Sequence, residues 1–257
     1  MDVLNVAGAE KWYGTYPGIL DATLAVPSGA ICVLLGANGA GKTTLLNMVA
    51  AQSPPSKGEI SLCARQVWAD PTRAKRVLGF VPDADNDLPD YLTGREYLLF
   101  IATTHNLSAE TGSERIHSLL SRFDLVDAEN RLIKGYSHGM RKKLQIAAAL
   151  MHDPALLVID EPTNGLDPIS VRILRDYLRV IATGHRAILI ATHDLNFAQR
   201  LADSVYIVSR QRIVAAGTLP QLLQQFGCED LEEVYIKACS APPEGHASGT
   251  SLPRGAS

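Results

Sequence analysis

The sequence predicts an α/β fold with a mainly parallel core sheet, an N-terminal β region and an inserted helical subdomain. Three observations support this. The first 36 residues carry the alternating and short apolar runs that are typical of strands. Later segments alternate between strand-like and helix-like patterns, which favours a parallel sheet covered on both faces. Between residues 88 and 151 consecutive helical segments replace this alternation.

The expected strands and the first helix follow one another along the first 87 residues. ILDATLAV (19–26) alternates, and AICVLL (30–35) is a short apolar run that ends in a glycine-rich loop. A helix is expected over 42–51 and is closed by the turn sequence SPPSKG. EISLCARQVW (59–68) and RVLGFV (76–81) are further strand candidates.

The helical subdomain is predicted over residues 88–151. TGREYLLFIATTHNL begins with Thr93 and has Glu96 three residues later, which is a capping box. Helices over SAETGSERIHSLLSRFDL and after YSHGM complete the subdomain.

The core is predicted to comprise residues 1–87 and 152–239. Its second part reads as ALLVID (strand), 168–182 (helix), RAILIAT (strand), 194–202 (helix) and SVYIVSRQRIVAAG (a strand and then a turn). Residues 240–257 are small, polar and rich in Pro and Gly, so we predict a disordered tail there.

Composition limits the possible functions. The 257 residues carry a formal net charge of −3, and no nucleic-acid partner is expected because the basic excess of such binders is lacking. The four cysteines form no C-x-x-C pair, which argues against zinc. No stretch approaches the roughly 20 apolar residues of a membrane span, so a membrane role would require a partner.

A phosphate-binding loop is predicted at GANGAGKT, which matches G-x-x-x-x-G-K-[ST] between a strand and a helix. In this motif, glycines let backbone N–H groups face an anion, and the helix N-terminus adds partial positive charge. Lys42 would reach the β- and γ-phosphates, and the Thr43 hydroxyl would bind Mg²⁺.

Two acidic residues and a histidine are the candidate catalytic groups. Asp160 ends an apolar strand, and ligands of open α/β sheets bind beyond such strand ends, so Asp160 is expected to hold Mg²⁺. Glu161 would activate the attacking water as a general base. His193 ends a strand that should neighbour that of Asp160, and it would reach the γ-phosphate or the water. His105, His117 and His152 are interpreted as surface residues.

A second glycine-bearing turn, YSHGM, opens a helix without a nucleotide loop of its own. Ser137 is a good N-cap, and the helix directs its positive end toward an anion. Gly139 leaves room for a phosphate, and Arg141, Lys142 and Lys143 would add positive potential.

Together these segments resemble the ABC ATPases, the nucleotide-binding subunits of ATP-binding-cassette transporters, over roughly residues 4–238. GANGAGKTT resembles the Walker A motif, LLVIDEP the Walker B motif with its glutamate, GLDP the D-loop, ATHD the switch histidine and YSHGM the LSGGQ signature. The resemblance implies a P-loop NTPase fold of the ABC-ATPase type, with a RecA-like ATP-binding core and an N-terminal antiparallel β subdomain.

The resemblance also implies how ATP and Mg²⁺ are bound. The expected ATP contacts within one chain are Tyr13, Gly36, Asn38, Gly39, Ala40, Gly41, Lys42, Thr43 and Thr44. Two copies would pack head to tail, and the ATP of one copy would be contacted by Ser137, His138, Gly139, Met140 and Asp167 of the other. Tyr13 would stack on adenine, with Trp12 as the alternative, because neighbouring strand residues face opposite sides.

One departure from the family pattern lies at Asp83, where a glutamine is expected. Aspartate is shorter and anionic, so it could bind the metal but could not donate a hydrogen bond to water. VPD…LTGREYL, YSHGM and LEEVYIKAC resemble the ATP-binding subunits of ABC-2-type exporters, and Asp83 is interpreted as a feature of that branch.

The sequence therefore predicts the ATPase subunit of a membrane exporter. It would act as a homodimer at the cytoplasmic face of the membrane, with residues 88–100 facing a separately encoded transmembrane permease subunit. Two alternatives stay open at this point: an ABC ATPase that acts on ribosomes or nucleic acid, and a regulatory ATP-binding module with little hydrolysis.

Overall fold

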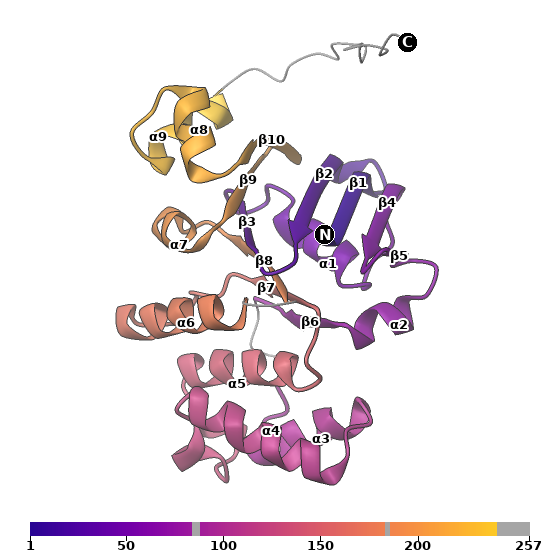
Figure 1. Cartoon of the computed structure of the whole chain (residues 1–257), viewed down its shortest axis with the longest axis vertical. Coiled ribbons are helices and arrows are strands. Elements are labelled where there is room, and N and C mark those ends of the chain that lie inside the picture. Colours follow the sequence, from indigo (N-terminus) through magenta and orange to yellow (C-terminus); the bar gives the residue numbers. More distant parts are fainter. Residues whose placement is uncertain (84–87, 183–185, 241–257) are drawn as a thin grey trace, which may run out of the picture.

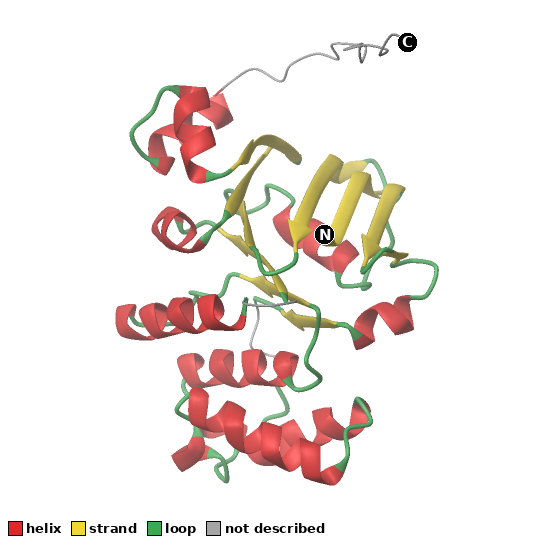
Figure 2. Ribbon diagram, in the orientation of Figure 1, coloured by secondary structure: helices red, strands yellow, loops and turns green. Residues whose placement is uncertain are grey.

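Two sheets and a group of helices build the protein (Figures 1 and 2). The computed structural model describes residues 1–83, 88–182 and 186–240. The smaller sheet is antiparallel and has the order β2-β1-β4-β5. Its strands are β1 Asp2–Tyr13, β2 Tyr16–Pro27, β4 Lys57–Leu62 and β5 Arg65–Gln66. This sheet confirms the antiparallel N-terminal part of the predicted fold.

The larger sheet has the order β10-β9-β3-β8-β7-β6 and is parallel except for the β9–β10 pair. Its strands are β3 Ile31–Leu35, β6 Leu78–Val81, β7 Leu156–Asp160, β8 Ala187–Thr192, β9 Ser204–Ser209 and β10 Arg212–Gly217. Strands β7 and β8 are neighbours, as predicted. Because β3, β7 and β8 are parallel, the segments that follow them meet at one edge of the sheet.

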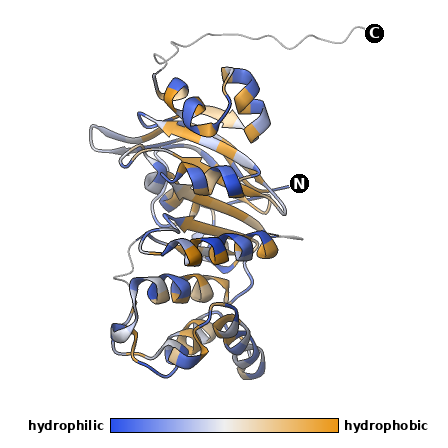
Figure 3. Ribbon diagram, turned by 90° about the vertical axis from the view of Figure 1, so that its left-hand side faces the viewer, coloured by the Kyte–Doolittle hydropathy of each residue, from blue (hydrophilic) through white to orange (hydrophobic). Residues whose placement is uncertain are grey.

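The two faces of this sheet are covered by different layers. In β3, Ile31, Val33 and Leu35 pack into one buried cluster and Cys32 and Leu34 into the other. The first cluster contains residues of the helices around residues 94–150 and 168–201, and the second contains those of the helix after β3 and of the small sheet. Figure 3 shows apolar central strands between helices of mixed polarity, as expected when each helix buries one side only.

The helices mostly begin after a residue whose side chain caps the first turn, and the helix that follows β3 is the exception. They are α1 Lys42–Val49, α2 Pro71–Arg76, α3 Gly94–Thr104, α4 Ala109–Arg122, α5 His138–Leu150, α6 Pro168–Ile181, α7 Leu195–Leu201, α8 Leu219–Phe226 and α9 Leu231–Ser240, with short 3₁₀ turns η1 Val126–Ala128 and η2 Ile133–Gly135. The capping box of Thr93 and Glu96 is present. Among the described residues, no helix is both long and apolar enough to cross a membrane.

Two expected strands are hairpins instead. The run 59–68 is divided by Cys63 and Ala64, and the run 204–217 by Arg210 and Gln211, all four with positive φ. The strand pattern continues on both sides of these turns, and neither turn contains the Gly or Asn that usually marks one. The residue pattern of these two segments therefore predicts one continuous strand where the structure has a hairpin.

Two further expectations need correction. His105 and His152 do not lie free on the surface: both are half-buried, and their rings stack at 3.8 Å between centroids. Ser240 is the last residue of α9 and not part of a tail, and the rest of the predicted tail, 241–257, lies outside the described residues.

Candidate active site

The phosphate loop connects β3 to α1 (Figure 1). A side chain at Gly36 would collide with the backbone carbonyl of Val208, and Gly41 has a φ of 108°, so glycine is required at both positions. The Lys42 ammonium donates to the carbonyl oxygens of Gly36 (2.7 Å) and Ala37 (3.2 Å) and therefore lies folded over the loop. Asn38, Gly39 and Ala40 complete the loop, and Thr43 and Thr44 follow in the first turn of α1.

Thr43 and Asp160 meet at the edge of the large sheet. The Thr43 hydroxyl donates to Asp160 Oδ2 at 2.7 Å. Asp160 is only 2% exposed, and its other oxygen, Oδ1, is buried without a hydrogen-bond partner among the described residues. Burial, together with the nearby Glu161 and Asp83 carboxylates, raises the pKa of Asp160 above its usual value.

These oxygen atoms fit a magnesium ion. Mg²⁺ prefers hard oxygen ligands and is usually held by one or two protein groups together with substrate phosphates. A buried carboxylate oxygen without a partner, beside a hydroxyl at the start of the phosphate loop, offers that ligand set. A cation here would also offset the crowding of negative charge that raises the pKa of Asp160.

Glu161 connects the phosphate loop to His193. Its Oε1 lies 3.4 Å from the Lys42 ammonium, and its Oε2 lies 2.9 Å from His193 Nδ1. Oε2 also accepts from the Thr192 hydroxyl at 3.1 Å. The Glu161 side chain is 8% exposed and that of His193 is 50% exposed. The carboxylate is thus held from both sides, next to a histidine that is open to solvent.

The Glu161 backbone is unusual. Its φ is 45°, a left-handed conformation that few residues other than glycine, asparagine and aspartate adopt. Its N–H donates to the carbonyl of Ala191 at 2.8 Å, which continues the β7–β8 ladder past Asp160. With the chain held in this way, the Asp160 side chain meets Thr43 and the Glu161 side chain meets Lys42 and His193.

Asp83 lies near this site. Its Oδ1 accepts from the Asn164 side chain at 2.7 Å, and its charge contributes to the raised pKa of Asp160. Lys142, which is 2% exposed, donates to the carbonyls of Pro82 (2.9 Å) and Asp83 (3.1 Å). Lys142 therefore connects helix α5 to the Asp83 segment, a contact between distant residues that the sequence does not indicate.

The turn before α5 has the capping geometry that the sequence predicts. Ser137 Oγ accepts from the Met140 N–H at 3.3 Å. His138 and Gly139 lie against Gly165 and Leu166 of the following GLDP turn. Arg141, expected to add positive potential, instead pairs with Asp90 at 2.8 Å.

The GLDP turn ends at the cap of α6. Asp167 Oδ1 accepts from the N–H groups of Ile169 (2.9 Å) and Ser170 (3.0 Å). The bond that the Ser170 hydroxyl donates to Oδ2, followed by the bonds from the Ser170 and Ile169 N–H groups, lowers the pKa of Asp167. Asp167 therefore fixes where the GLDP turn ends and α6 begins.

Tyr13 lies beside the phosphate loop at the end of β1. A Cβ atom at Gly18 would lie 2.8 Å from the Tyr13 ring and 2.9 Å from the Thr44 side chain, so these three residues are neighbours. Tyr13 is 50% exposed, which leaves ring surface for a base. The Trp12 indole, which is 40% exposed, donates to Glu10 Oε2 at 3.1 Å, and the adenine role of Tyr13 stays a prediction.

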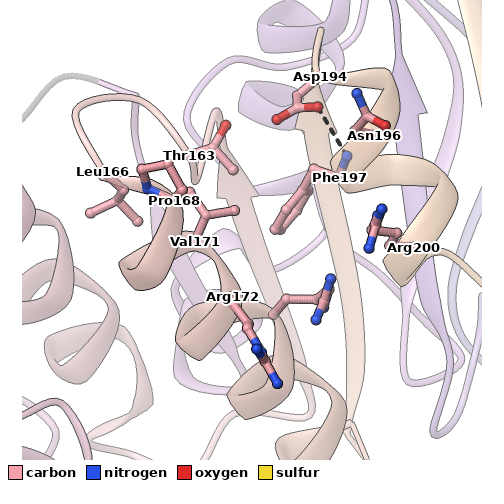
Figure 4. Close-up of a pocket in the computed structure, with 10 residues that line it drawn as sticks. Thr163, Leu166, Pro168, Val171, Arg172, Asp194, Asn196, Phe197 and Arg200 are labelled. Carbon is pink, nitrogen blue, oxygen red and sulfur yellow. Dashed lines mark hydrogen bonds between the residues drawn. The ribbon is translucent and has the colours of Figure 1, made fainter.

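A hollow of about 680 Å³ lies between α6 and α7 (Figure 4). Arg172 and Arg175 come from α6 and Arg200 from α7, and Asp194 accepts from the Phe197 N–H at its rim. No residue of the phosphate loop lines this hollow, so it is not the nucleotide site.

The comparisons with known proteins agree with this geometry. Residues 19–164 match the ABC transporter family. The chain is 34% identical over 218 residues to the ABC transporter ATP-binding protein NatA of Bacillus subtilis (85% of this chain, 89% of that protein). It is 35% identical to the Nod factor export ATP-binding protein I of Ralstonia nicotianae (91% and 72%) and 34% identical to the daunorubicin resistance ATP-binding protein DrrA3 of Streptomyces coeruleorubidus (91% and 74%).

Solved structures show the same fold. The ATP-binding subunit of an ABC transporter superposes with a TM-score of 0.86 at 31% identity, covering 92% of this chain and 99% of the other. A dimeric ATP-binding cassette in a post-hydrolysis state superposes with a TM-score of 0.76 at 21% identity, covering 84% and 98%, which supports the fold alone. The predicted fold class, family and ATPase activity are confirmed: the chain belongs to the ABC transporter family, among its ATP-binding, ATP-hydrolysing members.

Proposed function

We propose that this protein hydrolyses MgATP to drive export through a separate transmembrane subunit, as one of two identical ATPase subunits at the cytoplasmic face of the membrane. The observation that carries the ATPase part is the placement of Glu161 between Lys42 and His193, beside the Thr43–Asp160 pair. The names of relatives that serve drug resistance and Nod factor export support the exporter part.

The residues of one chain have separate roles in this proposal. The N–H groups of the loop and the Lys42 ammonium bind the β- and γ-phosphates, and Tyr13 stacks on adenine. Thr43 and Asp160 would hold Mg²⁺, with Asp83 as a further ligand or water contact. When bound, the ion neutralises charge that develops on the phosphates.

Glu161 takes a proton from the attacking water. Without nucleotide, the Glu161 carboxylate forms an ion pair with Lys42 and is oriented by hydrogen bonds with Thr192 and His193. Thr192 and His193 keep the carboxylate oriented when the Lys42 ammonium turns to the phosphates, so the base stays preorganised for the reaction. His193, half-exposed at the mouth of the site, then contacts the γ-phosphate or the water.

The second half of each site comes from the other copy. Helices α1 and α5 cover opposite faces of the large sheet, so the Ser137 turn belongs to a different layer from the phosphate loop of its own chain (Figure 1). The positive end of α5 nevertheless offers Ser137, His138, Gly139 and Met140 to an anion. A head-to-tail dimer supplies that anion as the γ-phosphate of the partner's ATP, with Asp167 nearby.

The exporter assignment can be tested by purification from native membranes. A tagged chain should purify in detergent with a polytopic membrane protein, and vesicles that hold both should hydrolyse ATP faster than the chain alone. The Glu161→Gln variant is the matched control, since it should form the same complex without turnover. The exporter assignment would be refuted if the chain purified with ribosomes instead, or if the membrane protein did not change the ATPase rate.

A further inference from the structure

The two-residue turn between β9 and β10 is formed by residues that rarely adopt its backbone conformation. Ser209 and Arg212 are paired across the hairpin, and the two residues between them, Arg210 and Gln211, have φ values of 49° and 59°. Two-residue turns with both φ values positive favour Asn-Gly and similar pairs, because other side chains are strained in this conformation. Strain of this kind tends to occur where a side chain serves a function.

The Gln211 side chain reaches the phosphate loop. Its Nε2 donates to the carbonyl oxygen of Gly39 at 3.2 Å, across 172 positions of sequence. The backbone of Gln211 is anchored separately, because its carbonyl accepts from the Leu20 N–H at 2.7 Å and its Cα packs close to Gly41. The turn is thus docked by backbone contacts, and the side chain adds one further bond to the loop.

That bond acts on the peptide unit that joins Gly39 to Ala40. In a trans peptide the carbonyl and the N–H point in opposite directions. On one side Gln211 holds the Gly39 carbonyl, and on the other the Ala40 N–H donates to the Ala37 carbonyl at 3.2 Å, which Lys42 also contacts. The peptide unit two positions before Lys42 is therefore fixed from outside and from inside the loop.

We propose that Gln211 is a positioning residue that holds the phosphate loop in its nucleotide-binding conformation before ATP arrives. It does not touch the nucleotide. It adds a second restraint to the Gly39–Ala40 peptide, at a glycine whose backbone permits many conformations. The proposal rests on the phosphate loop being the nucleotide site, as in the function proposed above.

Two substitutions separate the side-chain bond from the backbone strain. Gln211→Met keeps an unbranched side chain of similar length and the same strain but removes the donor. Gln211→Gly removes the donor and relieves the strain. Arg210→Gly is the control, since it relieves the same kind of strain at the neighbouring position, where the exposed Arg210 side chain makes no described contact with the loop.

The measurements are the dissociation constant of a fluorescent ATP analogue on the isolated chain, the melting temperature without nucleotide, and the steady-state KM and kcat. Both Gln211 variants should bind nucleotide about three- to tenfold more weakly, which is the factor expected for one hydrogen bond. KM should rise by the same factor while kcat at saturation stays near the wild-type value. Gln211→Gly should melt at or above the wild-type temperature, so stability and affinity should move in opposite directions.

The outcomes are distinguishable. Wild-type affinity in either folded Gln211 variant overturns the proposal, and so does an equal loss of affinity in Arg210→Gly, which would assign the effect to the turn backbone. If the wild-type chain itself binds no nucleotide, the proposed function fails instead.

Discussion

Replacing Glu161 with glutamine tests the proposed general base with little change in shape. The amide oxygen can take the place of Oε2 and keep the bonds from Thr192 and His193. The amide nitrogen then lies where Oε1 faced the Lys42 ammonium at 3.4 Å, so one ion pair is lost and two donors face each other. Lys42 keeps the Gly36 and Ala37 carbonyls as partners, so the loop should stay folded.

The structure therefore predicts separate effects on binding and on turnover. ATP binding should be retained, because Lys42 keeps the Gly36 and Ala37 carbonyls as partners and Glu161 is not among the groups proposed to bind the nucleotide. The hydrolysis rate should fall about 10²–10⁴-fold, the usual contribution of a general base, which corresponds to roughly 3–5 kcal/mol in the activation free energy. Phosphate release at saturating MgATP measures the rate, and gel filtration with ATP should show the dimer accumulating.

Two results would refute this reasoning. A wild-type rate would mean that Glu161 is not the base. Loss of ATP binding together with loss of turnover would mean that the carboxylate mainly supports the loop through Lys42.

The remaining predictions concern the dimer, the metal and pH. Ser137→Arg should leave ATP binding to the monomer intact but abolish dimer closure and ATPase activity, measured by gel filtration and phosphate release; loss of monomer binding would place Ser137 in its own chain's pocket. Asp83→Gln should keep a substantial part of the ATPase rate at saturating Mg²⁺ and Asp83→Ala less, because only glutamine can still accept from Asn164; if both match wild type, Asp83 has no role at the metal. Burial, followed by the neighbouring His105, lowers the pKa of His152 from 6.5 to about 4, so the unfolded chain binds more protons and stability should fall as the pH drops from 6.5 toward 4. The melting temperature should fall less between pH 7 and pH 5 in His152→Gln than in the wild type, and an equal fall in both proteins would contradict this.

The sequence was most informative where function depends on short segments. The loop of Gly36–Thr43, the pair Asp160–Glu161 and His193 each follow an apolar strand, and parallel strands deliver such segments to one edge. Their convergence could therefore be predicted from local pattern and strand order. The roles of Ser137 and Asp167 across a dimer stay predictions.

The supporting contacts could not be predicted in this way. Lys142 donates to the Asp83 segment from 59 positions away, and Gln211 donates to the Gly39 carbonyl from 172 positions away. Such contacts depend on how distant elements pack, and the two donor residues carry no local motif. From the sequence, Lys142 was expected only to add positive potential near the turn before α5.

The left-handed backbone at Glu161 has a consequence for which residues this position can accept. Aspartate and asparagine adopt that conformation more readily than glutamate, so local backbone preference alone would select the shorter carboxylate. The longer side chain spans from the end of β7 to both Lys42 and His193. Reach, rather than charge alone, is therefore the property that this position requires, and a carboxylate one methylene shorter would satisfy the backbone while leaving one of its two partners without contact.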